Sequence, residues 1–153
     1  MKKNVLIILL SIFVLSCNSN DDNPEMTKIE FTTISKSSLK GNGKEGIIQQ
    51  NLVITNQNSL NDLITKMNSI NNVSYPFLET DIDFSKHKII AVFDKIMPNG
   101  GYSLDLEIIS NSENVIVRNT RLVSEEGGNA TTVITQPFHI VKIPNSDLPI
   151  IFE

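Results

Sequence analysis

The stretch from Lys88 to Tyr102 constrains the fold more than any other part of the sequence. An apolar run (89–93) is followed by the turn sequence Met97-Pro98-Asn99-Gly100-Gly101 and then by a segment in which apolar and polar residues alternate (102–108). Short branched apolar runs bounded by turn residues are typical of buried strands, and alternation is typical of a strand with one buried face. Asn-Gly-Gly reaches positive φ at little steric cost. The pattern therefore predicts two antiparallel strands joined by a turn in which the glycines serve backbone geometry.

The first 16 residues have the layout of a bacterial export signal. Lys2 and Lys3 precede an apolar run that is too short to span a membrane comfortably. The run ends in Val14-Leu15-Ser16-Cys17, which resembles a lipobox. The resemblance implies that residues 1–16 are a lipoprotein signal peptide and that Cys17 is acylated and becomes the first residue of the mature chain. Acyl chains contribute about 0.8 kcal/mol per buried methylene, so this lipid would anchor the protein in a membrane without a transmembrane helix.

Residues 17–27 are polar and acidic and show no apolar periodicity. Such a composition predicts a flexible tether after the lipidated cysteine. Asp21 and Asp22 also resemble the signal that sends lipoproteins of Bacteroidetes-type bacteria to the cell surface, and a plain solvated tether is the alternative. We therefore expect a lipid-anchored protein at the outer membrane or cell surface of a Gram-negative bacterium, with the leaflet left open.

Residues 28–153 are long enough for one domain with its own core. Leu60, Leu63, Ile64, Met67 and Ile70 form one stripe of a helix, for which Ser59 is the expected N-cap. Pro137 interrupts a long strand and predicts an edge or a bulge there. We expect an α+β fold, with a mainly antiparallel β-sheet of about seven strands and one amphipathic helix packed on it. The expected strands are 28–35, 47–55, 89–93, 102–108, 115–122, 131–143 and 149–152.

Charge and residue types narrow the function. A formal net charge of -4 argues against nucleic-acid binding, which needs a basic face. His87 is expected to be a solvated turn residue, and His139, on the strand face opposite Phe138, an exposed or rim residue. Asp81 and Asp83 lack the further ligands of a calcium loop. The sequence therefore predicts no enzyme, no cofactor and no metal.

Three segments resemble the C-terminal domain of the PrcB family. They are Asp83-Phe84-Ser85-Lys86, Gly100-Gly101-Tyr102-Ser103 and the stretch from Thr135 to Pro144. The resemblance covers 81–152 and extends back over the helical stripe. The family takes its name from a lipoprotein subunit of a surface protease complex, thought to assist the protease rather than to cut. The resemblance implies a non-catalytic role and no catalytic residues.

The leading hypothesis is a lipid-anchored accessory module that binds a partner protein, such as a secreted protease. A tight turn and an interrupted edge strand leave backbone and aromatic groups available to another chain. The expected partner-binding residues are Gly100, Gly101, Tyr102, Pro137, Phe138 and His139. The alternative is a small-ligand or glycan-binding surface lipoprotein, for which a pocket lined by polar groups would be the mark.

Overall fold

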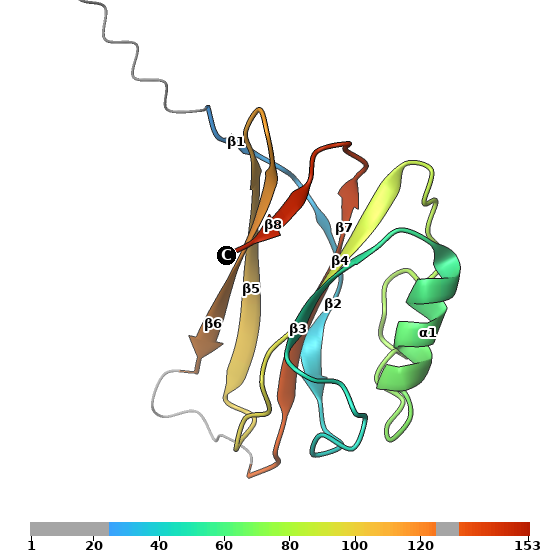
Figure 1. The fold of residues 1–153 in the computed structure, drawn as a ribbon. Coiled ribbons are helices and arrows are strands. Elements are labelled where there is room, and N and C mark those ends of the chain that lie inside the picture. Colours follow the sequence, from blue (N-terminus) through green and yellow to red (C-terminus); the bar gives the residue numbers. More distant parts are fainter. Residues whose placement is uncertain (1–24, 125–131) are drawn as a thin grey trace, which may run out of the picture.

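The computed structural model of the protein describes residues 25–124 and 132–153, which form three layers: one helix, a middle sheet and an outer sheet (Figure 1). The middle sheet has the strand order β2-β7-β4-β3, and the outer sheet has the order β1-β5-β6-β8. The elements are β1 (Thr27–Lys28), β2 (Thr32–Leu39), β3 (Gln50–Ile54), α1 (Gln57–Met67), β4 (His87–Phe93), β5 (Tyr102–Ser110), β6 (Val115–Val123), β7 (Gln136–Pro144) and β8 (Ile150–Phe152).

The middle sheet is buried on both faces, which explains why β4 is an uninterrupted apolar run. Ile89, Ala91 and Phe93 face the helix and pack in a core with Leu60 and Met67 of α1. The alternate residues of β4 and β7 face the outer sheet and form a second core with Leu104, Leu106, Ile108, Val115 and Val117. A strand between two layers has no solvent side, so apolar residues occupy both of its faces.

The α+β class is confirmed, with a correction to the number of sheets. The described residues hold eight strands in two sheets rather than about seven in one. The first expected strand, 28–35, is divided, because β1 pairs with β5 of the outer sheet and β2 pairs with β7 of the middle sheet. The last strand, β8, runs parallel to β6, while the other strand pairs are antiparallel.

The helix begins and ends earlier than its apolar stripe predicts. Asn56, not Ser59, is the N-cap: its φ is -152°, and its side-chain oxygen accepts a hydrogen bond from the Ser59 backbone N–H at 2.9 Å. Asparagine is among the strongest N-caps, so it competes successfully with the serine three residues on. The helix ends at Met67, which leaves Ile70 outside it and 46% exposed.

The expected hairpin between 89–93 and 102–108 is wrong. β4 lies in the middle sheet and β5 in the outer sheet, so the Asn-Gly-Gly segment carries the chain from one layer to the other. Neither Gly100 nor Gly101 has a positive φ. The turn is instead closed by a side chain, because the Asn99 side-chain oxygen accepts from the Gly101 N–H at 2.9 Å.

The position of Pro137 also differs from expectation, because β7 is an inner strand between β2 and β4. Pro137 is the second residue of β7, and its carbonyl accepts from the Asp94 N–H at 2.9 Å, just beyond the end of β4. In an antiparallel pair of this kind the returning bond would be donated to the Asp94 carbonyl by residue 137, which has no N–H. The side-chain amide of Gln136 donates to that carbonyl instead, at 2.8 Å. A neighbouring side chain thus makes the proline tolerable inside the sheet.

Candidate functional site

The six residues expected to bind a partner lie in two different environments. Gly100 is exposed, and Gly101 and Tyr102 are half-buried. Pro137, Phe138 and His139 are buried in the middle sheet. The prediction that this triplet presents side chains to a partner is therefore wrong: an interrupted strand exposes them only at an edge, and β7 has strands on both sides.

His139 faces the outer sheet and is 2% exposed, not a rim residue. Its Nε2 lies 3.1 Å from the Thr33 hydroxyl, and its ring packs edge-on against Phe31. Burial, together with the nearby charge of Lys36, lowers the pKa of His139 from 6.5 to about 4. The imidazole is thus neutral at pH 7 and serves packing between the sheets.

An ion pair joins the two sheets near the end of β4. The Arg121 guanidinium, on β6, donates to both carboxylate oxygens of Asp94, at 2.5 and 2.6 Å. Burial alone would raise the pKa of Asp94, but the hydrogen bonds from Arg121 and from the Lys95 N–H outweigh it and hold that pKa below its usual value. Asp94 is therefore a structural anion, held in place by a bidentate arginine.

The loop between β2 and β3 is shaped by a buried carboxylate. Glu45 is buried, and its Oε1 accepts a hydrogen bond from the Gly41 N–H at 2.7 Å. A Cβ at Gly41 would lie 2.3 Å from that oxygen, so any larger residue there would displace the Glu45 carboxylate. Gly43 and Gly46 both have positive φ, 76° and 67°. These constraints hold the loop in one compact form.

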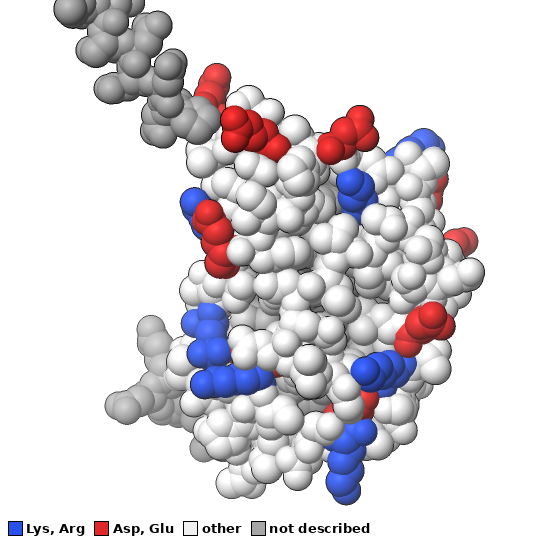
Figure 2. All heavy atoms as spheres, in the orientation of Figure 1, with Lys and Arg blue, Asp and Glu red and all other residues white. Residues whose placement is uncertain are grey.

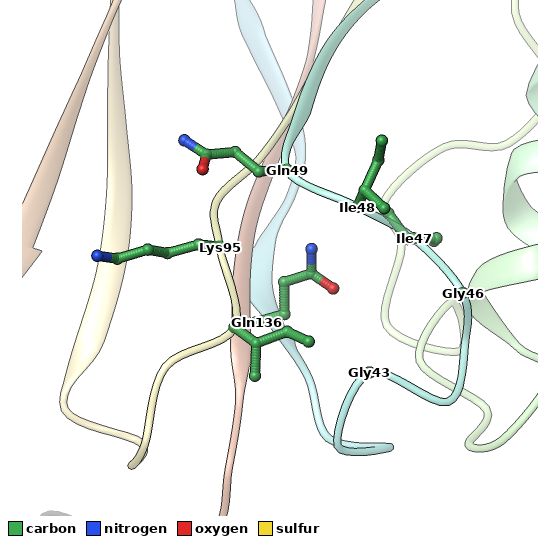
Figure 3. A pocket seen from close by; sticks show the side chains of 8 residues that line it. Gly43, Gly46, Ile47, Ile48, Gln49, Lys95 and Gln136 are labelled. Atoms are coloured by element: carbon green, nitrogen blue, oxygen red, sulfur yellow. The ribbon is translucent and has the colours of Figure 1, made fainter.

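A pocket of about 320 Å³ lies between this loop and the segment that follows β4 (Figure 3). It opens where β3 and β4 diverge, beyond the pairing of Gln50 with Phe93. We call it the isoleucine slot, because Ile47, Ile48 and Ile96 all line it, with the Ile47 side chain buried in the core under α1. Ile48 is 74% exposed and Ile96 is 47% exposed. The other lining residues are Gly43, Gly46, Gln49, Lys95 and Gln136.

Gln136 supplies a buried polar group to the slot. The residue is 1% exposed, and its Oε1 has no hydrogen-bond partner among the described residues. Its amide orientation is fixed, because Nε2 donates to the Asp94 carbonyl and an exchanged oxygen would face that carbonyl. Figure 3 shows the amide directed from β7 into the space in front of the 46–48 segment. The slot is thus an apolar site with one hydrogen-bond acceptor.

Exposed charge around the slot is basic. Lys95 lines it, with its side chain directed away from Gln136 in Figure 3. Lys44 lies between the two lining glycines, and the Lys66 Cε lies 3.9 Å from where a Cβ of Gly46 would stand. The nearest acids in sequence, Glu45 and Asp94, are both buried. Asp94 is paired with Arg121, whereas Glu45 accepts from Gly41 through Oε1 and its Oε2 has no partner among the described residues. On the face seen in Figure 2, basic side chains predominate at the lower end, where the β2–β3 loop lies in Figure 1.

The other residues considered for a catalytic or metal-binding role, His87 and Asp83, have structural surroundings. His87 is the half-buried first residue of β4 rather than a solvated turn residue. Asp83 accepts from Ser85 and pairs with Lys86, which lowers its pKa to about 2. Among residues 25–124 and 132–153 no three His, Cys, Asp or Glu side chains are grouped as metal ligands. Within the same residues, no helix is long and apolar enough to cross a membrane.

Several sequence predictions lie outside the described residues. They are the signal peptide at 1–16, lipidation at Cys17 and most of the tether at 17–27. Comparison with protein-family models, with curated proteins and with solved structures finds no match to this chain. The resemblance to the PrcB family therefore stays a prediction.

The isoleucine slot was not anticipated from the sequence. Two signals could have found it. Ile47-Ile48 is a pair of adjacent apolar residues directly after a glycine-rich loop, where one of the two must face outward. Gln136 precedes a proline in a strand, where a side-chain amide can replace the missing N–H.

Proposed function

We propose that this protein is a lipid-anchored, non-catalytic envelope protein that binds a partner protein. The sequence supports anchoring through Cys17, and the resemblance to the PrcB family supports an accessory role, with a secreted protease as the kind of partner that it implies. The observation that carries the binding proposal is the isoleucine slot, which replaces the 137–139 triplet as the candidate contact surface.

The slot has the features of a contact site in a protein interface. Full burial of one branched apolar side chain contributes about 1.5–3 kcal/mol, and Ile48 and Ile96 both retain surface that a partner could cover. Binding energy in protein interfaces concentrates where an anchor side chain fills a pocket. The loop that forms one wall is held by the hydrogen bond between Gly41 and Glu45, so little conformational entropy is lost when a partner fills the slot.

A photoreactive amino acid at position 48 tests partner binding. The lipidated full-length protein is expressed in its native envelope, irradiated, and the cross-linked species is identified by mass spectrometry. We expect one defined partner from position 48, and none from a matched probe at Ile151 on β8, which is 42% exposed in the outer sheet. The same species from both positions, or none from position 48, would contradict the proposal.

Anchoring has its own test. Metabolic labelling with an alkyne fatty acid, followed by mass spectrometry of the N-terminal peptide, should show an acylated Cys17 as the first residue. Cys17→Ser is the control and should lose the label. A mature chain that begins elsewhere would contradict the lipobox prediction.

The size of the slot favours a second candidate function, the binding of a small ligand. Its volume of about 320 Å³ lies at the lower end of small-molecule sites, which span about 300–1,000 Å³. Native mass spectrometry of protein released from its own membrane tests this alternative. A retained small molecule that is absent from Ile48→Ser would favour it over a partner protein.

A further inference from the structure

We infer that the isoleucine slot takes an apolar side chain from an acidic, extended segment of the partner protein, whose backbone N–H donates to Oε1 of Gln136. The inference rests on the proposed function and specifies the chemistry of the partner. Three independent features of the slot carry it: its walls, its buried acceptor and the charge around it.

The walls select an apolar side chain. Ile48 and Ile96 provide the exposed apolar side chains of a space that is bordered on the loop side by glycine backbone. A Cβ at Gly43 would lie 2.5 Å from the Cδ1 of Ile96, so the loop and Ile96 are in close contact without one. A polar side chain placed here would lose water and gain only one hydrogen-bond partner, whereas an apolar one loses nothing by desolvation.

The acceptor selects a donor next to that side chain. An unsatisfied buried acceptor is costly, so a group that donates to Oε1 of Gln136 recovers that cost on binding. The amide cannot rotate to satisfy itself, because its nitrogen serves the Asp94 carbonyl that Pro137 leaves without a donor. In an extended peptide, every residue except proline carries a backbone N–H, which is the donor required.

The charge around the slot selects an acidic sequence. Lys44, Lys66 and Lys95 are exposed, and among the described residues none of them takes part in an ion pair. The formal charge of the whole chain is -4, so this local concentration of lysine is opposite in sign to the rest of the molecule. Aspartate or glutamate beside the anchor side chain would complement it and speed association.

Selection from a random peptide library tests the inference. The full-length lipidated protein in detergent micelles is the bait, and Ile48→Ser, the pair Lys66→Glu with Lys95→Glu, and the control Ile151→Ser are run in parallel. We expect enriched sequences with one apolar residue flanked by Asp or Glu. Ile48→Ser should abolish the enrichment, charge reversal should abolish or invert the acidic preference, and Ile151→Ser should change nothing. All four positions are exposed, so the variants are expected to fold.

The enriched peptide then tests the hydrogen bond. Replacement of the amide N–H at the anchor residue by an ester oxygen removes the donor, and we expect about tenfold weaker binding in calorimetry, which corresponds to about 1.4 kcal/mol. In Gln136→Met the ester and the amide peptide should bind equally. Affinity should also fall as salt rises from low to physiological ionic strength, because the lysines are exposed.

The outcomes separate this inference from the proposed function. No enrichment, enrichment of basic or neutral peptides, or enrichment that persists in Ile48→Ser overturns the inference. If position 48 still cross-links a partner in the native envelope, the proposed function stands without it. If both experiments fail, neither stands.

Discussion

The two sheets of this protein differ in how many of their faces are covered, and this difference accounts for most of what the chain shows. The middle sheet lies between α1 and the outer sheet, so β4 buries five consecutive residues from Ile89 to Phe93. The outer sheet has one solvent face, so β5 alternates, with Leu104 and Leu106 buried and Asp105 and Glu107 exposed. We therefore expect the strands of the middle sheet, which are buried on both faces, to contribute most to the free energy of unfolding. The slot lies at the end of this sheet, beyond the last residue pair of β3 and β4.

The comparison predicts a large difference between a truncation on a covered face of the middle sheet and one on the solvent face of the outer sheet. Phe138, on β7, is fully buried and packs against Phe93 and Phe77. Phe138→Ala should lower the free energy of unfolding by about 3–5 kcal/mol, because the cavity left between α1 and the sheet cannot collapse. Ile151→Ala, on β8 of the outer sheet, should cost less than about 1 kcal/mol. Urea denaturation measures both, and equal losses would contradict the layer assignment.

The second largest effect should be destabilisation by acid, through His139 between the two sheets. The pKa of His139 is about 4 in the folded protein and near 6.5 when unfolded, so the unfolded chain binds the extra proton first. Its contribution to stability is complete above about pH 6.5 and is lost as pH falls toward 4, by up to about 3 kcal/mol at about 1.4 kcal/mol per pKa unit. Denaturation of the wild type and of His139→Gln across this range isolates the histidine. Parallel pH profiles would show that His139 is not buried as described.

The ion pair between Asp94 and Arg121 should contribute somewhat less to the free energy of unfolding than the burial of His139. Arg121→Met removes the partner of a buried carboxylate, Asp94, and should cost about 1–3 kcal/mol, below the range for a fully buried pair because Arg121 is partly exposed. Arg118→Met is the matched control on the same strand, since Arg118 pairs with Glu107 and Glu153 in solvent. We expect the control to cost under about 1 kcal/mol. A cost at 118 as large as that at 121 would remove the distinction between the two pairs.

The smallest expected effect concerns the element that covers the middle sheet. Asn56→Ala removes the N-cap of α1 and should cost about 1 kcal/mol in chemical denaturation. Ser59→Ala should leave stability within about 0.5 kcal/mol, because only the backbone N–H of Ser59 takes part in the cap. If Ser59→Ala lowered the free energy of unfolding more than Asn56→Ala, Ser59 would be the N-cap, as the apolar stripe predicts, and the assignment of Asn56 would be wrong.

Much of the fold could be predicted from local patterns. The uninterrupted run at 89–93 and the alternation at 102–108 depend only on which faces of a strand are exposed to solvent. The structure contains both strands, as β4 and β5. The helical stripe from Leu60 to Met67 was found for the same reason. The pattern does not say which sheet a strand joins. Asn99-Gly100-Gly101 therefore has the sequence of a hairpin turn but carries the chain from one sheet to the other.

The candidate site was predicted less well, because it depends on contacts between segments far apart in the sequence. His139 points to the opposite face of β7 from Phe138. The alternation indicates that this face is exposed to solvent only if no second sheet packs on it, and the outer sheet does. Gln136 acquires its role from the Asp94 carbonyl, 42 residues away. The slot arises where β3 and β4 diverge, and strand pairing of that kind is not encoded in either segment alone.

Carbene footprinting of the full-length protein tests most directly whether the isoleucine slot is the surface that a partner covers. Labelling in the native envelope is compared with labelling of the purified protein in liposomes, so that membrane contact is the same in both. We expect Ile48 and Ile96 to be labelled less in the native envelope, with Ile151 and Leu122 of the outer sheet unchanged. Equal labelling of the slot in both states, with protection of Ile151 and Leu122 instead, would contradict the account.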